Sequence, residues 1–264
     1  MIHFIVRASA LLLFLLVVIQ FLLGRFLYSC GAPPAGLYLH GLPQPVVNPP
    51  IVRFEFPQST CQIAYFHGRG RPLPWNYYML GPLYLQTGCT IIALEYCSLR
   101  FDAILESARD LTHCPEGMRC FFMCASMGCS IMLRSLDSTA AVSDLILENP
   151  PTSLAAVASF HLHDWIPSAA LKVILGPDND WEAPVPLPSH WRALLLTSEK
   201  DEIVPPHMSD ALAGNGINAT RVLLTRANHG DAPSHPLYLI SIKHFIAGRA
   251  SPSTMRQTNH TRDR

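Results

Sequence analysis

Six short apolar segments alternate with segments of helix length, and this alternation restricts the fold more than any other feature of the chain. Continuous apolar strands separated by crossover helices are typical of a parallel sheet that is covered on both faces. The sequence therefore predicts an α/β fold. The apolar segments are QIAYFH (62–67), TIIALEY (90–96), MRCFFMC (118–124), DLILEN (144–149), RALLLT (192–197) and TRVLLT (220–225). Segments of helical character between them include 74–86, 101–113, 127–137 and 206–214.

Two regions interrupt this rhythm and define the expected domain organisation. Residues 30–50 are rich in Pro and Gly and are interpreted as a linker, and 51–249 as the folded domain, although strand signals before residue 60 are weak. Residues 150–191 are interpreted as a lid inserted over the carboxyl edge of the sheet. The polar tail, 250–264, is expected to be disordered.

The N-terminus carries a membrane-targeting signal within residues 1–29. An apolar run extends from Ala8 to Gly24 and is interrupted only by Ser9 and Gln20. A spanning helix needs about 17 to 25 residues, whereas a cleaved signal needs an apolar stretch of roughly 7 to 15. The run is therefore predicted to be a retained signal anchor or single transmembrane helix, and a cleaved signal peptide is the alternative.

Two glycosylation triplets favour a lumenal domain in the endoplasmic reticulum or secretory pathway. They begin at Asn218 and Asn259 and satisfy the N-x-[ST] pattern. Arg7 and Arg25 flank the apolar run on opposite sides, so the positive-inside rule does not settle the orientation. The chain is expected to be a single-pass membrane glycoprotein.

Charge argues against a nucleic-acid-binding protein. The chain has 19 Lys and Arg against 19 Asp and Glu, and no basic stripe interleaved with aromatic residues. Phosphate neutralisation requires such a stripe. Neutral, apolar or membranous partners are expected instead.

All eight cysteines precede residue 130, and four of them are close together, at 114, 120, 124 and 129. No C-x-x-C pair is present, which argues against zinc and thioredoxin-type sites. Because two of the four belong to an apolar strand, buried free thiols are expected for this group, with structural disulfides as the alternative.

The segment CASMG (124–128) lies between the third apolar strand and a helix-compatible segment. A nucleophile elbow places its serine on such a turn, between small residues that let strand and helix approach closely. Gly128 satisfies the second small position, but Cys124 occupies the first, where glycine is usual. Ser126 is the candidate nucleophile.

A serine nucleophile needs a histidine base and a carboxylate that orients it. Downstream of Ser126, one apolar strand leads into SEKDEIVPP with Asp201, and the next leads into RANHGD with His229. Both loops are expected at the edge of the sheet that carries the serine. Rival assignments are Glu202 for the acid and His207 or His235 for the base, and Glu95 is expected to be structural.

The oxyanion formed during acyl transfer needs backbone donors. They are expected from the loop after the first core strand, HGRGRP (67–72), and from the residue after the nucleophile. The candidates are the N–H groups of Arg69, next to Gly68, and of Met127.

Several of these motifs together resemble the α/β-hydrolase superfamily. They are YFHGRG, CASMG, LILENPPTS, SEKDEIVPP and NHGD, in order over residues 60–248. The sequence looks most similar to membrane-anchored abhydrolase-domain-containing proteins. This resemblance implies an α/β-hydrolase fold, a triad of Ser126, Asp201 and His229, and hydrolysis of acyl esters or thioesters of lipids or lipidated proteins. Cys124 departs from the family pattern.

The expected function is a membrane-anchored, monomeric serine hydrolase that acts on a small-molecule acyl ester or lipid, with no cofactor and no metal ion. The apolar segment 154–162 of the lid could face an acyl chain or simply pack on the sheet, and Arg69 and Arg71 could hold an anionic headgroup. The alternatives are an inactive, hydrolase-like binding protein on the membrane and a serine peptidase with the same triad.

Overall fold

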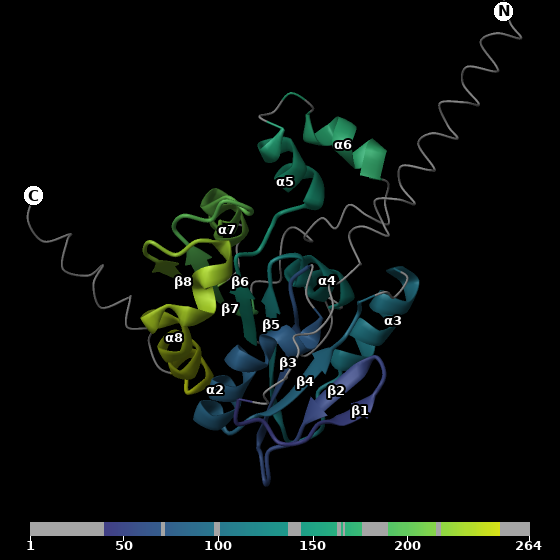
Figure 1. The fold of residues 1–264 in the computed structure, drawn as a ribbon, viewed down its shortest axis with the longest axis vertical. Helices are drawn as coiled ribbons and strands as arrows, with labels where there is room; N and C mark the ends of the chain where they lie inside the picture. Colours follow the sequence, from purple (N-terminus) through teal and green to yellow (C-terminus); the bar gives the residue numbers. More distant parts are fainter. Residues whose placement is uncertain are drawn as a thin grey trace, which may run out of the picture.

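The computed structural model describes most of the chain after its N-terminal segment, namely residues 40–69, 72–97, 101–136, 144–162, 165, 167–175, 190–214 and 218–248. These residues form an eight-stranded sheet with the strand order β1-β2-β4-β3-β5-β6-β7-β8 (Figure 1). The strands are β1 (Val46–Asn48), β2 (Ile51–Phe54), β3 (Cys61–Phe66), β4 (Thr90–Leu94), β5 (Arg119–Ala125), β6 (Asp144–Glu148), β7 (Arg192–Ser198) and β8 (Asn218–Leu224).

The six apolar segments of the sequence are the strands β3 to β8, and all of them pair in parallel. The two short strands β1 and β2 extend the sheet antiparallel at one edge. A parallel neighbour requires a crossover that returns the chain to the same end of the sheet, which the intervening helices provide. The predicted α/β class and mostly parallel sheet are confirmed.

Helices cover both faces of the sheet because successive side chains of each strand point to opposite faces. In β3, Phe66 belongs to an apolar cluster that includes residues of α3, α4 and α7, whereas Tyr65 belongs to a second cluster that includes residues of α2 and α8. The helices and 3-10 turns are η1 (Leu73–Asn76), α2 (Tyr77–Thr87), α3 (Phe101–Leu111), α4 (Met127–Ser135), α5 (Leu154–His161), α6 (Ser168–Leu175), α7 (Pro206–Ala213), η2 (His229–Ser234) and α8 (Pro236–Ile246).

The insertion expected as a lid contains α5 and α6. Figure 1 shows these two helices together beyond the ends of β5 and β6. They form a small apolar cluster of their own, with Ala155, Leu171 and Leu175 at its centre. The ring nitrogen Nε2 of His161 also lies 2.9 Å from the carbonyl oxygen of Ile203, so α5 contacts the loop after β7.

Two expectations for the N-terminal part have different outcomes. Residues 46–48, which fall in the expected linker, form β1, because they pair with β2 at the sheet edge. The predicted membrane segment within residues 1–29 lies outside the described residues. No helix in the described part of the chain has the length and apolar character needed to cross a membrane.

The expectation of free thiols at positions 114, 120, 124 and 129 is wrong. Disulfides join Cys114 to Cys120 and Cys124 to Cys129. The chain reverses direction before and after β5, which brings the cysteines of each pair close together. The Cα–Cα distance is 5.8 Å for Cys114 and Cys120 and 4.8 Å for Cys124 and Cys129, within the range that a disulfide requires. A third disulfide joins Cys61 and Cys89 at the amino ends of β3 and β4, and no described cysteine is a free thiol.

Candidate active site

Ser126 occupies a sharp turn between β5 and α4. Its backbone angles are φ 50° and ψ −125°, in a region that side-chain-bearing residues rarely adopt. The N–H of Ser126 donates a 2.8 Å hydrogen bond to the carbonyl of Glu148, the last residue of β6. This bond fixes the turn to the neighbouring strand, so the serine is held at the carboxyl edge of the sheet.

Gly128 permits the close approach of α4 to β3. A Cβ atom at this position would lie 2.3 Å from the carbonyl oxygen of Phe66 and 2.4 Å from that of His67. Both contacts involve backbone atoms, which cannot rotate away. The glycine of the CASMG segment is therefore required by contact with the first core strand, as the elbow interpretation predicts.

The three predicted triad residues lie in one hydrogen-bonded chain. Nε2 of His229 lies 3.0 Å from Oγ of Ser126. Nδ1 of the same ring lies 2.7 and 2.9 Å from the two carboxylate oxygens of Asp201. A carboxylate only accepts hydrogen bonds, so Nδ1–H donates to Asp201 and Nε2 is left to accept the serine proton.

The topology brings these groups together from distant parts of the sequence. Ser126 follows β5, Asp201 follows β7 and His229 follows β8, all at the carboxyl edge. The Asp201 side chain is 1% exposed, whereas that of His229 is 16% exposed. The Asp201 carboxylate is thus shielded from water, whereas the His229 imidazole keeps part of its surface exposed.

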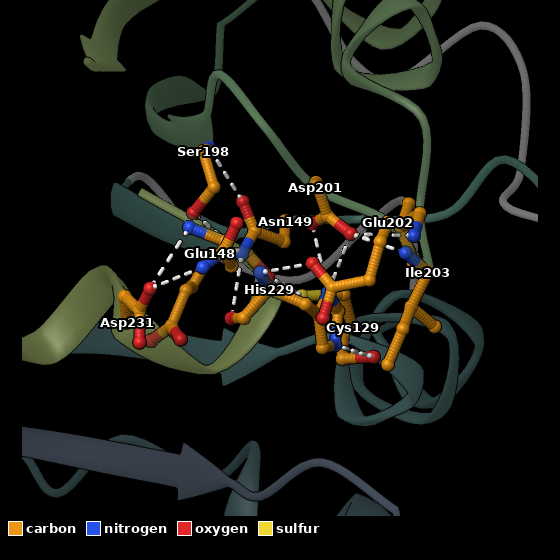
Figure 2. Close-up of polar contacts among 12 residues, drawn as sticks. Cys129, Glu148, Asn149, Ser198, Asp201, Glu202, Ile203, His229 and Asp231 are labelled. Atoms are coloured by element: carbon orange, nitrogen blue, oxygen red, sulfur yellow. Dashed lines mark hydrogen bonds and ion pairs between the residues drawn. The ribbon is translucent and has the colours of Figure 1, made fainter. Parts of the chain in front are cut away.

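Backbone amides hold the Asp201 carboxylate in place. Its Oδ1 accepts hydrogen bonds of 2.9 Å from Ile203 N–H and 2.7 Å from Val204 N–H, in the turn that follows β7. Figure 2 shows this turn beside the His229 ring. These bonds fix the orientation of the carboxylate that in turn orients the imidazole.

The site favours the protonated form of His229. Burial lowers the pKa of this histidine, but the hydrogen bond and the charge of Asp201 raise it, and the charges of Glu148 and Glu202 raise it further, so the net direction is upward. An imidazole with a raised pKa is a stronger base. Its protonated form is also the species that a proton transfer from Ser126 would create.

The oxyanion-hole candidates lie where the sequence predicts them, although their role stays a prediction. A Cβ atom on Gly68 would lie 3.5 Å from Cβ of Ser126, so the loop after β3 passes next to the serine. Arg69 follows directly and is exposed, and Met127 is the buried first residue of α4. Arg71, named as a headgroup ligand, lies outside the described residues.

The rival triad candidates occupy other places. Glu202 accepts a 3.0 Å hydrogen bond from the backbone N–H of His229 and does not contact its ring. Nδ1 of His235 accepts from Leu237 N–H and caps α8. His207 is exposed within α7.

Glu95 also lies outside the triad. Its carboxylate accepts from the backbone N–H groups of Leu73 and Cys97, at 2.6 and 3.0 Å. One oxygen lies 3.5 Å from Nε2 of His67. These contacts fit the expected structural role.

Glu95 belongs to a group of possible metal ligands, but this group does not suit a metal ion. Among the described residues, side-chain atoms of His67, Glu95 and Cys97 lie within 4.8 Å of one another. Cys97 is disulfide-bonded, so it has no thiolate to offer. The geometry gives no reason to add a metal to the site.

The disulfide between Cys124 and Cys129 spans the elbow. The two cysteines lie two residues before and three residues after Ser126, one in β5 and one in α4. Cys124, which occupies the position where glycine is usual, therefore forms a disulfide with Cys129. This bridge ties together the two elements between which the serine lies.

Two residues that sequence reasoning missed, Glu148 and Asn149, lie directly behind the triad. Asn149 has φ 44°, and its Nδ2 donates to the carbonyl of His229 (3.2 Å) and to Oγ of Ser198 (3.1 Å). Its Oδ1 accepts from Ser198 N–H (2.8 Å), and Figure 2 shows the amide between these partners. In the sequence, the two residues form the EN pair of LILENPPTS, a motif whose only distinguishing feature is its part in the family resemblance.

Several solved structures share the fold of this chain. An esterase from Pyrobaculum calidifontis aligns with a TM-score of 0.55 and 13% identity, covering 80% of this chain and 87% of that one. A truncated carbohydrate esterase from gut microbiota aligns with a TM-score of 0.57 and 13% identity, covering 82% and 99%. The Pyrococcus furiosus esterase PF2001 aligns with a TM-score of 0.53 and 13% identity, covering 75% and 84%.

At these identities the likeness concerns the fold, and it confirms the α/β-hydrolase fold that the sequence predicts. The sequence matches no protein-family model and no curated protein sequence. The membrane-anchored group that it resembles stays a prediction. The activity must therefore be argued from the site itself.

Proposed function

We propose that this chain, an α/β-hydrolase by fold, is a serine hydrolase that cleaves acyl esters or thioesters. The observation that carries the proposal is the continuous hydrogen-bonded chain from Ser126 through His229 to Asp201 at the carboxyl edge of the sheet. A serine on a strained turn, a base with a raised pKa and a buried acid are the parts that acyl transfer requires.

The reaction proceeds in two steps. Nε2 of His229 takes the proton of the Ser126 hydroxyl as Oγ attacks the acyl carbonyl, and the imidazolium then gives this proton to the leaving alcohol or thiol. Water, activated in the same way, hydrolyses the acyl-enzyme and returns the serine. Asp201 stabilises the positive charge that His229 carries in between.

The backbone N–H groups of Arg69 and Met127 would bind the negative oxygen of the tetrahedral intermediate. They are proposed because Gly68 lies beside the serine and Met127 follows it directly. Donors of this kind typically lower the barrier by about 3 kcal/mol each. Neither side chain takes part in this role.

We infer that the substrate carries the acyl chain of a lipid or lipidated protein, because the lid exposes apolar side chains. Four apolar side chains around α5 and α6 are exposed to between 43% and 87%, and they are Phe160, Leu162, Trp165 and Val173. Apolar surface at the rim of a site suits an apolar substrate or a lipid surface.

The proposal includes a membrane anchor at the N-terminus and a domain in the lumen of the secretory pathway. The apolar run from Ala8 to Gly24 supports the anchor. The disulfides support the lumen, because such bonds form and persist in oxidising compartments. Asn218, exposed at the start of β8, would then be available for glycosylation.

Labelling with a fluorophosphonate probe tests the proposed activity. Wild-type protein is expected to react, whereas Ser126→Ala and His229→Ala are expected to lose the label while retaining the circular-dichroism spectrum of the fold. His113→Ala is the matched control, because this exposed histidine lies between α3 and the amino end of β5, at the edge of the sheet opposite to the triad. If folded wild-type protein does not react, the proposed serine-hydrolase activity is wrong.

Labelled protein would then be assayed on matched substrates. Ester, thioester and amide substrates that carry the same acyl chain separate an ester hydrolase from a peptidase. A series from acetyl to palmitoyl tests the expected preference for long apolar chains.

A further inference from the structure

Glu148 is a buried carboxylate that the proposed reaction does not use. It ends β6 and is 7% exposed. In the sheet it pairs with Ala125, the residue before the nucleophile, and its carbonyl accepts the hydrogen bond from Ser126 N–H. The Glu148 backbone therefore lies next to the turn that carries the serine.

The carboxylate is held by a buried tyrosine. The hydroxyl of Tyr238, from the first turn of α8, donates to Oε2 at 2.5 Å. Tyr238 is fully buried in the apolar cluster between α8 and the sheet. A charged group in such surroundings is costly unless another charge compensates it.

The charged and titratable groups that interact with Glu148 come from four elements. They are Asp201 after β7, His229 in η2, Tyr238 in α8 and Tyr65 in β3. Of these, only His229 becomes positive, and Glu202 also acts on it. The only compensating cation in this described group is therefore the protonated base of the triad.

The neighbouring residue, Asn149, ties the end of β6 to the loop that carries this base. Asn149 donates through its side-chain amide to the carbonyl of His229, at 3.2 Å. Its own N–H donates to the carbonyl of Leu196 in β7, at 2.9 Å. Figure 2 shows Glu148 and Asn149 next to the histidine, so the end of β6 and the histidine loop form one unit.

We propose that Glu148 is a positioning residue that acts through His229, as a second counter-charge that stabilises the imidazolium formed during catalysis. This inference rests on the proposed serine-hydrolase function. Asp201 binds the ring directly, and Glu148 adds a second negative charge from the end of β6 without touching the substrate. Tyr238 keeps this charge in place by donating to it.

The electrostatics of the pair agree with this geometry. Burial raises the pKa of Glu148 to about 7, although the hydrogen bond from Tyr238 and the charge of His229 both lower it. Glu148 is thus ionised above neutral pH. His229 must be neutral in the same pH range, because only the neutral imidazole can accept the serine proton. When this transfer makes the imidazolium, the negative charge of Glu148 is already present to stabilise it.

The test compares Glu148→Gln with wild type by following the His229 ring resonances in an NMR pH titration. Glutamine keeps the shape of the side chain and an oxygen that accepts from Tyr238, but it carries no charge. The pKa of His229 is expected to fall by about 0.5 unit or more in the variant. The acid limb of kcat/KM is expected to move to lower pH by the same amount, and kcat to fall about tenfold.

Two further variants make the result decisive. Tyr238→Phe removes the donor that favours charged Glu148, and it is expected to lower the pKa of His229 in the same direction. Glu106→Gln is the matched control for loss of a carboxylate, because this glutamate is exposed on α3. It is expected to leave the titration of His229 unchanged.

The outcomes separate this inference from the proposed function. An unchanged pKa of His229 in both Glu148→Gln and Tyr238→Phe would overturn the role of Glu148, whatever the activity. Should Glu148→Gln fail to fold, Tyr238→Phe alone decides. A shifted pKa in a protein that does not react with the fluorophosphonate probe would uphold the electrostatic link and refute the hydrolase.

Discussion

Nε2 of His229 lies 3.0 Å from Oγ of Ser126, although 103 residues separate the two along the chain. The contact exists because both residues follow parallel strands of one sheet and therefore emerge at the same edge. This relationship allows each part of the candidate site to be tested by a single substitution.

Asp201→Asn is expected to lower kcat by about three to four orders of magnitude while leaving the fold intact. An asparagine donates as well as accepts, so it would favour the wrong tautomer of His229. Glu202→Gln is the matched control, because Glu202 binds the histidine backbone and not its ring. Similar kcat values for the two variants would contradict the assignment of the acid.

The pH dependence of activity follows from the raised pKa of His229. Attack requires a neutral imidazole, so kcat/KM is expected to fall as the pH decreases through a value above the ordinary 6.5. The acid limb of a kcat/KM profile measures this value. An acid limb below pH 6.5 would contradict the net upward shift caused by the carboxylates.

The same ionisation affects stability with the opposite sign. Because the folded-state pKa of His229 is raised, its charged pairing with Asp201 stabilises the protein fully below the unfolded pKa, and this contribution is lost as the pH rises through the folded pKa. His229→Ala is therefore expected to reduce the free energy of unfolding more at pH 5.5 than at pH 8.5. Urea denaturation at both pH values measures the difference.

Gly128→Ala is expected to distort the elbow. The new methyl group would lie 2.3 Å from the carbonyl oxygen of Phe66, so α4 must move away from β3. We expect a loss of at least about 2 kcal/mol of stability and of most of the activity. At Gly214 an added Cβ meets its nearest neighbour at an ordinary 3.5 Å, so Gly214→Ala is the control that should be tolerated.

Removal of the elbow disulfide by Cys124→Ala with Cys129→Ala is expected to destabilise the protein by roughly 2 kcal/mol and to lower kcat. The double variant that replaces Cys114 and Cys120 is the control. It removes a disulfide that closes a loop of similar length at the other end of β5. It should cost similar stability without the loss of kcat. Equal kcat in both double variants would show that the bridge has no role in holding the serine.

The sequence predicts the sheet and the triad because both depend on local patterns. Each strand from β3 to β8 is an apolar run, and Ser126, Asp201 and His229 each lie in the turn or loop that follows one of these runs. Chain order and the parallel sheet are then enough to bring the three residues to one edge. No tertiary contact needs to be known in advance.

The features that sequence reasoning missed depend on contacts across the fold. The strand β1 has three residues and is exposed, so its signal is too short to separate from a Pro-rich linker. The disulfides require the reversal of the chain around β5, which cysteine spacing does not reveal. Glu148 resembles any strand-end carboxylate until Tyr238 packs against it, 90 residues later in the chain.

The disulfides also bear on the order in which the protein is made. All eight cysteines precede residue 130, whereas Asp201 and His229 follow it. During synthesis the cysteines around the serine leave the ribosome before the acid and the base have been translated. The nucleophile can thus be locked into its turn while it still lacks the groups that would activate it, and the nascent chain is inert toward the acyl groups that the finished protein is proposed to cleave.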